Sequence, residues 1–295
     1  MTQTMYNNAS HIYKDVQQPY RNLYIYYIEG RLSSKVNITD RCFIGNWEED
    51  NFSFLFFSQP SDKLVNRLLQ KHPHLTLIDN YNMTYDEWQG GHTQQVSAGG
   101  FIIAPPWEKQ IDTSPEDTCI ALDPGVVFGT GTHPTTSHCL EAIDMVFRNE
   151  TIESALDLGT GTGLLALAIA KSGCKKVLAV DLNFLAAHTT EKNIRLNQLE
   201  NRVFSVCGRA EDFISYPVDL VIANIHYDVL QHLINYKFFS EKKFFIISGQ
   251  LRSQAKKVLQ KLSTYPVTII KKWEHTGIWH TFLVKNCSIK KQAII

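Results

Sequence analysis

Hydrophobic and polar positions follow different patterns in the two halves of this chain. Before residue 108, aromatic and β-branched residues gather in short runs that predict strands. One segment, 61–73, has apolar residues at helical spacing between a capping residue, Ser61, and a terminating proline, Pro73. The predicted strands are 23–28, 52–58, 75–79 and 100–107. Strands around one short helix predict a small α+β domain.

Beyond residue 137, apolar strands alternate with helices. The predicted strands are 155–159, 176–181, 203–208, 218–224 and 244–249, and the predicted helices are 137–147, 164–173 and 184–199. This alternation predicts a parallel sheet covered on both faces. Segments 267–273 and 279–286 flank a glycine-containing turn, so we expect a hairpin and an antiparallel final strand. The polar segment 108–122 predicts a connector.

Composition and charge narrow the class of protein. The chain has 295 residues, enough for two domains, and its 44% apolar and 20% charged residues are typical of a soluble globular protein. Lys+Arg and Asp+Glu both number 29, so we expect no direct nucleic-acid binding through a broad basic surface. The chain lacks an apolar run of about 18 residues, and its N-terminus lacks a secretory pattern, so no membrane association is expected.

The six cysteines form no C-x-x-C pair. Scattered thiols favour the reducing cytoplasm over a disulfide framework, and we expect neither a metal site nor an oligomer.

The segment ALDLGTGTGLLALAIA, residues 155–170, combines a strand, a glycine turn and a helix. The glycines Gly159, Gly161 and Gly163 allow a ligand to approach the backbone closely, and the helix directs free N–H groups toward it. Asp181 ends the next predicted strand, where a carboxylate can accept hydrogen bonds from a ribose. Together they predict a site for a nucleoside-containing cofactor.

Two cofactors and one alternative without a cofactor must be weighed. Residues 161–166 fit the G-x-G-x-x-A pattern of dinucleotide sites, which keeps NAD open. Asp157 before the first glycine instead makes D-x-G-x-G-x-G, which resembles the signature of class I S-adenosylmethionine methyltransferases. The expected antiparallel hairpin and a strand ending in Asn224 also resemble that fold. A glycine turn that binds nothing remains the third interpretation.

A second GTGT lies in DPGVVFGTGTHPTT, residues 123–136. It has no Lys after its glycines and so cannot be a P-loop. A linker leading into a helix start is one interpretation, with Pro134 in the first turn and threonines as caps. The exposed-looking Val127 and Phe128 favour a loop that folds over a bound ligand. An internal repeat is disfavoured because the residues around the two GTGT segments differ.

The order DPGVVFGTGTHPTT, DLGTGTG and VDLVIANI resembles the PrmA family, the ribosomal protein L11 methyltransferases. The resemblance implies a Rossmann-like S-adenosylmethionine methyltransferase domain with an antiparallel final strand, preceded by a ferredoxin-like α+β domain. We therefore expect a substrate-recognition domain at 1–107, a linker and cofactor-covering loop at 108–136, and the methyltransferase domain at 137–295.

The resemblance also implies the site. Thr136 would face the methionine end of the cofactor, Gly159 would let the backbone pass close to it, and Asp181 would hold its ribose. Asn224 would lie beside the sulfonium and the incoming amine. With Asp157, Gly161 and Gly163 these residues make up the expected cofactor site.

The sequence departs from the family pattern after Asn224. The family reads N-I-L-A there, whereas this chain has His226 and Tyr227 in the last two positions. Both side chains either pack within the loop or shape the acceptor pocket beside Asn224, where Tyr can face a cationic amine and His can accept a proton.

We therefore expect a protein-lysine or α-amino N-methyltransferase acting on ribosomal protein L11. The alternatives are the same chemistry on another protein or a small amine, or a catalytically silent module that binds S-adenosylmethionine.

Overall fold

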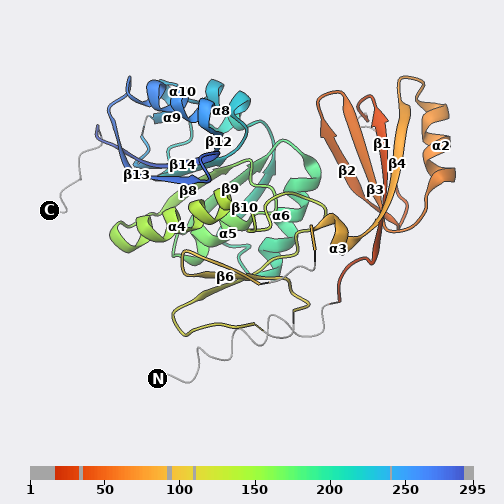
Figure 1. Cartoon of the computed structure of the whole chain (residues 1–295), viewed down its shortest axis with the longest axis horizontal. Coiled ribbons are helices and arrows are strands. Elements are labelled where there is room, and N and C mark those ends of the chain that lie inside the picture. Colours follow the sequence, from red (N-terminus) through yellow and green to blue (C-terminus); the bar gives the residue numbers. More distant parts are fainter. Residues whose placement is uncertain (1–16, 33–35, 92–94, 109–110, 240, 289–295) are drawn as a thin grey trace. The chain divides into compact units, whose positions relative to one another are not determined.

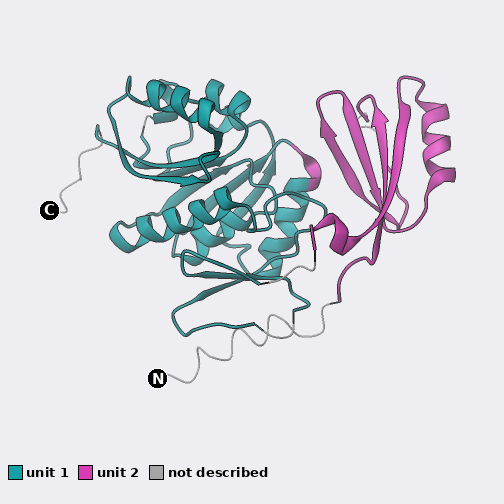
Figure 2. Cartoon of the chain, in the orientation of Figure 1, with its two compact units in different colours: residues 1–14, 95–182, 186–295 teal, residues 15–94, 183–185 magenta. Residues whose placement is uncertain are grey.

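The structure is a computed structural model that describes residues 17–32, 36–91, 95–108, 111–239 and 241–288. Contacts among the described residues divide them into two compact units. The smaller unit runs to residue 94 and includes 183–185, and the larger comprises 95–182 and everything from 186 onward (Figure 2). Residues 95–107, grouped above with the first domain, therefore fall in the larger unit by contact. The functional division of the chain stays a prediction.

The smaller unit is an antiparallel sheet with strand order β2-β3-β1-β4. Its elements are β1 (Asn22–Glu29), β2 (Phe43–Glu49), β3 (Phe52–Phe57), α2 (Asp62–Lys71), β4 (Thr76–Thr84) and α3 (Tyr85–Trp88). One sheet face packs on α2 through a core that includes Tyr26, Leu55, Phe57, Val65 and Leu68. This strand order is that of a ferredoxin-like α+β domain, as expected.

Three details of this unit differ from the sequence-based expectation. Ser61 occupies the N-cap position of α2, but its hydroxyl donates to the carbonyl of Gln59 (3.1 Å) instead of capping the helix. The strand 43–49 was not predicted, because polar residues interrupt its apolar pattern. β4 continues to Thr84, five residues beyond the predicted end, because its polar, exposed positions still pair with the backbone of β1.

The larger unit contains a seven-stranded sheet of order β10-β9-β8-β11-β12-β14-β13 (Figure 1). Its strands are β8 (Ser154–Leu158), β9 (Lys176–Asp181), β10 (Val203–Cys207), β11 (Leu220–Asn224), β12 (Phe244–Leu251), β13 (Val267–His275) and β14 (Trp279–Asn286). The first five strands pair in parallel, and β14 runs antiparallel to both of its neighbours. The predicted parallel sheet with an antiparallel final strand is confirmed.

Helices cover both faces of this sheet. They are α4 (Pro134–Asn149), α5 (Leu164–Lys171), α6 (Phe184–Leu196), α7 (Ala210–Phe213), α8 (Tyr227–Leu233), α9 (Tyr236–Phe239) and α10 (Arg252–Leu262). Side chains of α4 and α5 form one buried cluster with Ala155 of β8, and side chains of α8, α9 and α10 form another with Leu156 and Leu158. Successive residues of β8 thus point into opposite cores, as the pleat of a strand requires.

A short sheet of order β5-β6-β7 precedes α4. Its strands are β5 (Val96–Ala98), β6 (Phe101–Ala104) and β7 (Thr118–Ala121). Two prolines follow β6, so the strand predicted over 100–107 ends early. The segment 108–122, which was predicted as a connector, contains a strand at its apolar end, because Thr118–Ala121 pairs in parallel with β6. In the described part of the chain, helices are too short or too polar to cross a membrane.

Candidate active site

The candidate residues follow adjacent strands at the carboxyl edge of the large sheet. The glycine turn 159–163 follows β8, Asp181 ends β9, and Asn224 ends β11. β8 lies between β9 and β11, and from β8 the strand order proceeds outward in both directions. In open α/β sheets, ligands bind outside the carboxyl ends of the strands at such a switch point.

The glycine turn takes a backbone shape that suits glycine. Gly159, Gly161 and Gly163 have φ of +72°, +58° and +86°. A Cβ on Gly159 would lie 2.3 Å from Cγ2 of Ile225, the residue that follows β11. The N–H of Gly161 donates to Oδ2 of Asp181 (3.0 Å), which ties the turn to the end of β9.

Asp157 lies beneath this turn rather than on its surface. Its side chain is fully buried, and Oδ2 accepts a 2.7 Å hydrogen bond from the Thr160 hydroxyl. Oδ1 has no hydrogen-bond partner among the described residues. Burial, together with the negative charge of Asp181, raises the pKa of Asp157 to about 7. Asp157 therefore supports the turn from inside.

The two GTGT segments bind each other. The N–H of Thr162 donates to the carbonyl of Phe128 (3.2 Å), and the Thr162 hydroxyl donates to the carbonyl of Gly129 (2.6 Å). A Cβ on Gly161 would lie 2.6 Å from the same Phe128 oxygen. The loop 128–132 thus lies directly over the glycine turn. Phe128 leaves its side chain 73% exposed at this point.

Two asparagines that the sequence analysis did not single out hold the start of that loop. Asn193 of α6 donates to the carbonyls of Asp123 (2.9 Å) and Thr162 (2.8 Å), and its Oδ1 accepts from the Asp123 N–H (2.9 Å). Asn197 exchanges hydrogen bonds with the backbone of Ala121. Both side chains are buried, and their i, i+4 spacing within the predicted helix 184–199 is the signal that could have revealed them.

The HPTT segment begins α4, and His133 is its N-cap, accepting from the N–H of Thr135 (3.3 Å). The cap is thus a histidine and not one of the threonines. Thr136, in the first turn, is 4% exposed. The Ser248 hydroxyl donates to the carbonyl of Thr135 (3.4 Å) and bonds to the Thr281 hydroxyl (2.6 Å). These contacts fix the start of α4 to the carboxyl end of β12.

Asn224 ends β11 with a half-buried side chain. None of the described residues forms a hydrogen bond with its amide group, so this group is available to a ligand. Gly249 lies beside it with φ of +83°, and a Cβ there would be 3.2 Å from Oδ1 of Asn224.

His226 and Tyr227 follow in different environments. His226 is exposed and occupies the N-cap position of α8. Tyr227 is half-buried and packs on the core cluster of α8 and α10, with Nζ of Lys257 5.6 Å from its ring centroid. The ring of Tyr227 therefore contacts the core, whereas His226 does not, and the role of both side chains in an acceptor pocket stays a prediction.

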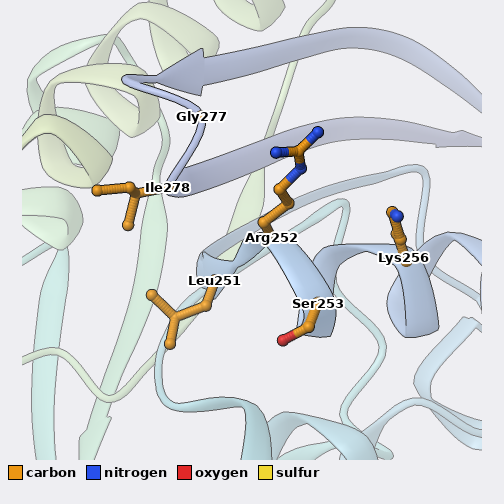
Figure 3. Close-up of a pocket in the computed structure, with 6 residues that line it drawn as sticks. All are labelled: Leu251, Arg252, Ser253, Lys256, Gly277 and Ile278. Carbon is orange, nitrogen blue, oxygen red and sulfur yellow. The ribbon is translucent and has the colours of Figure 1, made fainter.

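A pocket of about 470 Å³ lies where β12 ends and the turn between β13 and β14 begins. It is lined by Leu251, Arg252, Ser253 and Lys256 at the start of α10 and by Gly277 and Ile278 between β13 and β14 (Figure 3). It includes none of the expected cofactor residues. The glycine turn, and not this pocket, has the features that a nucleoside-containing cofactor needs.

The turn fits such a cofactor on three observations. Its positive-φ glycines present backbone rather than side chains, Asp181 lies at the end of the neighbouring strand, and the helix α5 begins directly after it. The described residues include no group of three or more His, Cys, Asp or Glu side chains that could hold a metal ion.

Comparisons with known proteins agree with this geometry. A family model described as "Ribosomal protein L11 methyltransferase (PrmA)" matches residues 59–286. The chain is 31% identical over 223 residues to the ribosomal protein L11 methyltransferase of Staphylococcus carnosus, covering 71% of each. It is 34% identical over 226 residues to that of Desulfitobacterium hafniense, covering 73% of this chain and 70% of the relative.

A solved structure has the same fold. The crystal structure of ribosomal protein L11 methylase from Lactobacillus delbrueckii subsp. bulgaricus superposes with a TM-score of 0.57 at 28% identity. The match covers 63% of this chain and 95% of that one. The chain therefore belongs to the ribosomal protein L11 methyltransferase (PrmA) family and is a methyltransferase that uses S-adenosylmethionine.

Proposed function

We propose that this enzyme transfers methyl groups from S-adenosylmethionine to amino groups of ribosomal protein L11. The observation that carries the proposal is the contact between Ile225 and Gly159, which brings the end of β11 against the glycine turn. Asn224 would thereby lie beside the cofactor's reacting end. The names of the relatives support L11 as the substrate.

The cofactor supplies a methyl group on a sulfonium sulfur, which is already a good leaving group. The backbone of the glycine turn would hold its nucleoside portion, and Asp181 would accept hydrogen bonds from the ribose hydroxyls. Thr136 would face its methionine end. Asp157, Gly161 and Gly163 would keep the turn in the shape that binding requires.

The acceptor amine must be neutral, because a protonated ammonium group has no lone pair with which to attack the methyl group. A lysine has an ordinary pKa near 10.4 and is charged at neutral pH. Desolvation beside a cation lowers that pKa, so the site can favour the neutral amine without a dedicated base. The Oδ1 atom of Asn224 can then accept a hydrogen bond from an amine N–H and orient its lone pair. Such positioning contributes up to about 7–11 kcal/mol in favourable intramolecular reactions.

His226 and Tyr227 would shape the acceptor pocket, and they are the residues by which this chain would differ from its relatives in substrate choice. His226 is exposed beside Asn224, while Tyr227 forms the first turn of α8. A His226→Leu variant is expected to change the ratio of rates on different amines. An unchanged ratio across a panel of peptides would remove His226 from this role.

Residues 1–107 would recognise the protein substrate, and residues 108–136 would link them to the catalytic part and cover the cofactor. We further propose that the enzyme works as a monomer in the cytoplasm, which fits the six free cysteines.

Label transfer tests the substrate. Purified enzyme and labelled S-adenosylmethionine are incubated with bacterial ribosomal protein L11, with a second ribosomal protein and with free lysine. Label in L11 alone supports the proposal. Label elsewhere identifies another protein or a small amine as the substrate, and cofactor binding without any transfer identifies a silent module.

A further inference from the structure

Gln250 is a buried polar side chain in an apolar strand. It is 0% exposed, in the run FFIISGQL of β12. Its Nε2 donates to the carbonyl of Ile225 (2.9 Å) and to the carbonyl of Ser248 (2.8 Å). One amide group therefore joins the end of β12 to the residue that follows Asn224.

The backbone around Gln250 is shaped for this contact. The register of β12 against β14 shifts between Ile247 and Gln250, and Gly249 within the shift has φ of +83°. Such a bulge re-aims the side chain that follows it. A Cβ on Gly249 would lie 2.9 Å from the carbonyl oxygen of Ile225, so glycine lets β11 come close enough for the bond.

The contact continues to the cofactor turn. Gln250 holds the carbonyl of Ile225, and the Ile225 side chain packs against Gly159. Any movement of the Ile225 backbone would therefore shift Asn224 relative to the glycine turn.

The hydrogen bonds of Gln250 are only partly satisfied. Its Oε1 is buried without a hydrogen-bond partner among the described residues. Burying this oxygen costs free energy, which offsets part of the stability that the two donated hydrogen bonds contribute.

We propose that Gln250 is a positioning residue that fixes the Asn224–Ile225 backbone at the distance from the glycine turn that methyl transfer requires. The inference rests on the proposed role of Asn224 in that reaction. Gln250 itself touches neither the cofactor nor the substrate.

Gln250→Met keeps the volume and removes both hydrogen bonds. At saturating cofactor, its single-turnover rate on L11 is expected to fall by about 10-fold, since small misplacements of reacting groups slow reactions strongly. Its affinity for S-adenosylmethionine should stay within about threefold, and its melting temperature should fall, because the carbonyls of Ile225 and Ser248 lose their donor. An unchanged rate would overturn the proposal, and so would an equal loss of rate in Gln254→Met, the control variant described next.

Gln254→Met is the matched control. Gln254 lies four residues further along the chain, in the first turn of α10, and its Oε1 accepts from the N–H of Leu251 (2.9 Å). Losing that bond should lower the melting temperature and leave the rate unchanged. Comparing the two variants therefore distinguishes a loss of methyl-transfer rate from a loss of stability. If Gln250→Met does not fold, Gln250→Glu keeps the side-chain length. Burial keeps its carboxyl group protonated, so it retains one donor in place of two. Its rate should then fall at unchanged cofactor affinity, and an unchanged rate would overturn the proposal.

Amide hydrogen exchange gives a readout that does not depend on the substrate. Exchange in segment 225–228 should be faster in Gln250→Met and unchanged in Gln254→Met, and equal exchange in both would overturn the proposal. If Asn224→Ala is slow while Gln250→Met is not, the Gln250 inference fails alone. If L11 is not methylated at all, the proposed function fails, and exchange still decides whether Gln250 holds Ile225.

Discussion

The hydroxyl of Thr162 donates a 2.6 Å hydrogen bond to the carbonyl of Gly129, joining the two GTGT segments of the chain. One segment follows β8 and the other precedes α4. Residues about thirty positions apart in the sequence therefore lie side by side at the expected cofactor site. The loop that would cover the cofactor is therefore held by the turn that would bind it.

Thr162→Val tests this connection, because it removes the hydroxyl and keeps the shape. We expect a loss of about 1 kcal/mol in the free energy of unfolding and weaker binding of S-adenosylmethionine, since the covering loop loses its anchor. Calorimetric titration and amide exchange over 125–132 would measure both effects. Thr132→Val, at an exposed position of the same loop, should change neither. Equal behaviour of the two variants would contradict the proposed anchor.

Gly159 and Gly173 separate two reasons for a glycine. Both have positive φ, but a Cβ would meet Ile225 at Gly159 and open space at Gly173. We expect Gly173→Ala to cost roughly 1–2 kcal/mol from backbone strain. Gly159→Ala should cost about 1–3 kcal/mol more, from overpacking, and should abolish cofactor binding. Chemical denaturation would give the free energy of unfolding of each variant, and titration its affinity for the cofactor. Equal losses of stability would mean that the contact with Ile225 adds nothing to the cost of Gly159→Ala.

Asp157 gives the cofactor-free protein a pH-dependent stability. Burial raises its pKa from 3.8 to about 7, so the folded state binds this proton more tightly than the unfolded state. The stabilisation is fully present below about pH 4 and is lost as the pH rises through 7. Asp157→Asn, which cannot ionise, should therefore gain stability relative to the parent protein between pH 5 and pH 8. Melting curves across this range would show the difference, and parallel curves would mean that Asp157 does not change its charge.

Local patterns were enough to predict much of the large unit. The apolar run 176–181 ends in Asp181 and forms β9 with the predicted bounds. The strand, glycine turn and helix around Gly159 also lie where the sequence placed them, because each depends on residues close together in the chain.

Contacts between distant segments could not be predicted in this way. The bonds from Asn193 to Asp123 and from Gln250 to Ile225 join residues 70 and 25 positions apart. Polar residues inside apolar helices or strands signal that a partner exists but do not identify it. The packing of Tyr227 on Lys257 likewise depends on α10, which the sequence pattern did not predict.

The most direct test of the account compares Asn224→Ala with Asp181→Ala in single-turnover methyl transfer to L11, alongside titration of the cofactor. We predict that Asp181→Ala mainly weakens binding of S-adenosylmethionine. Asn224→Ala should bind it within about threefold of the parent affinity yet transfer the methyl group roughly 100-fold more slowly, because the amine loses its orientation. Transfer at the parent rate by Asn224→Ala would contradict the account.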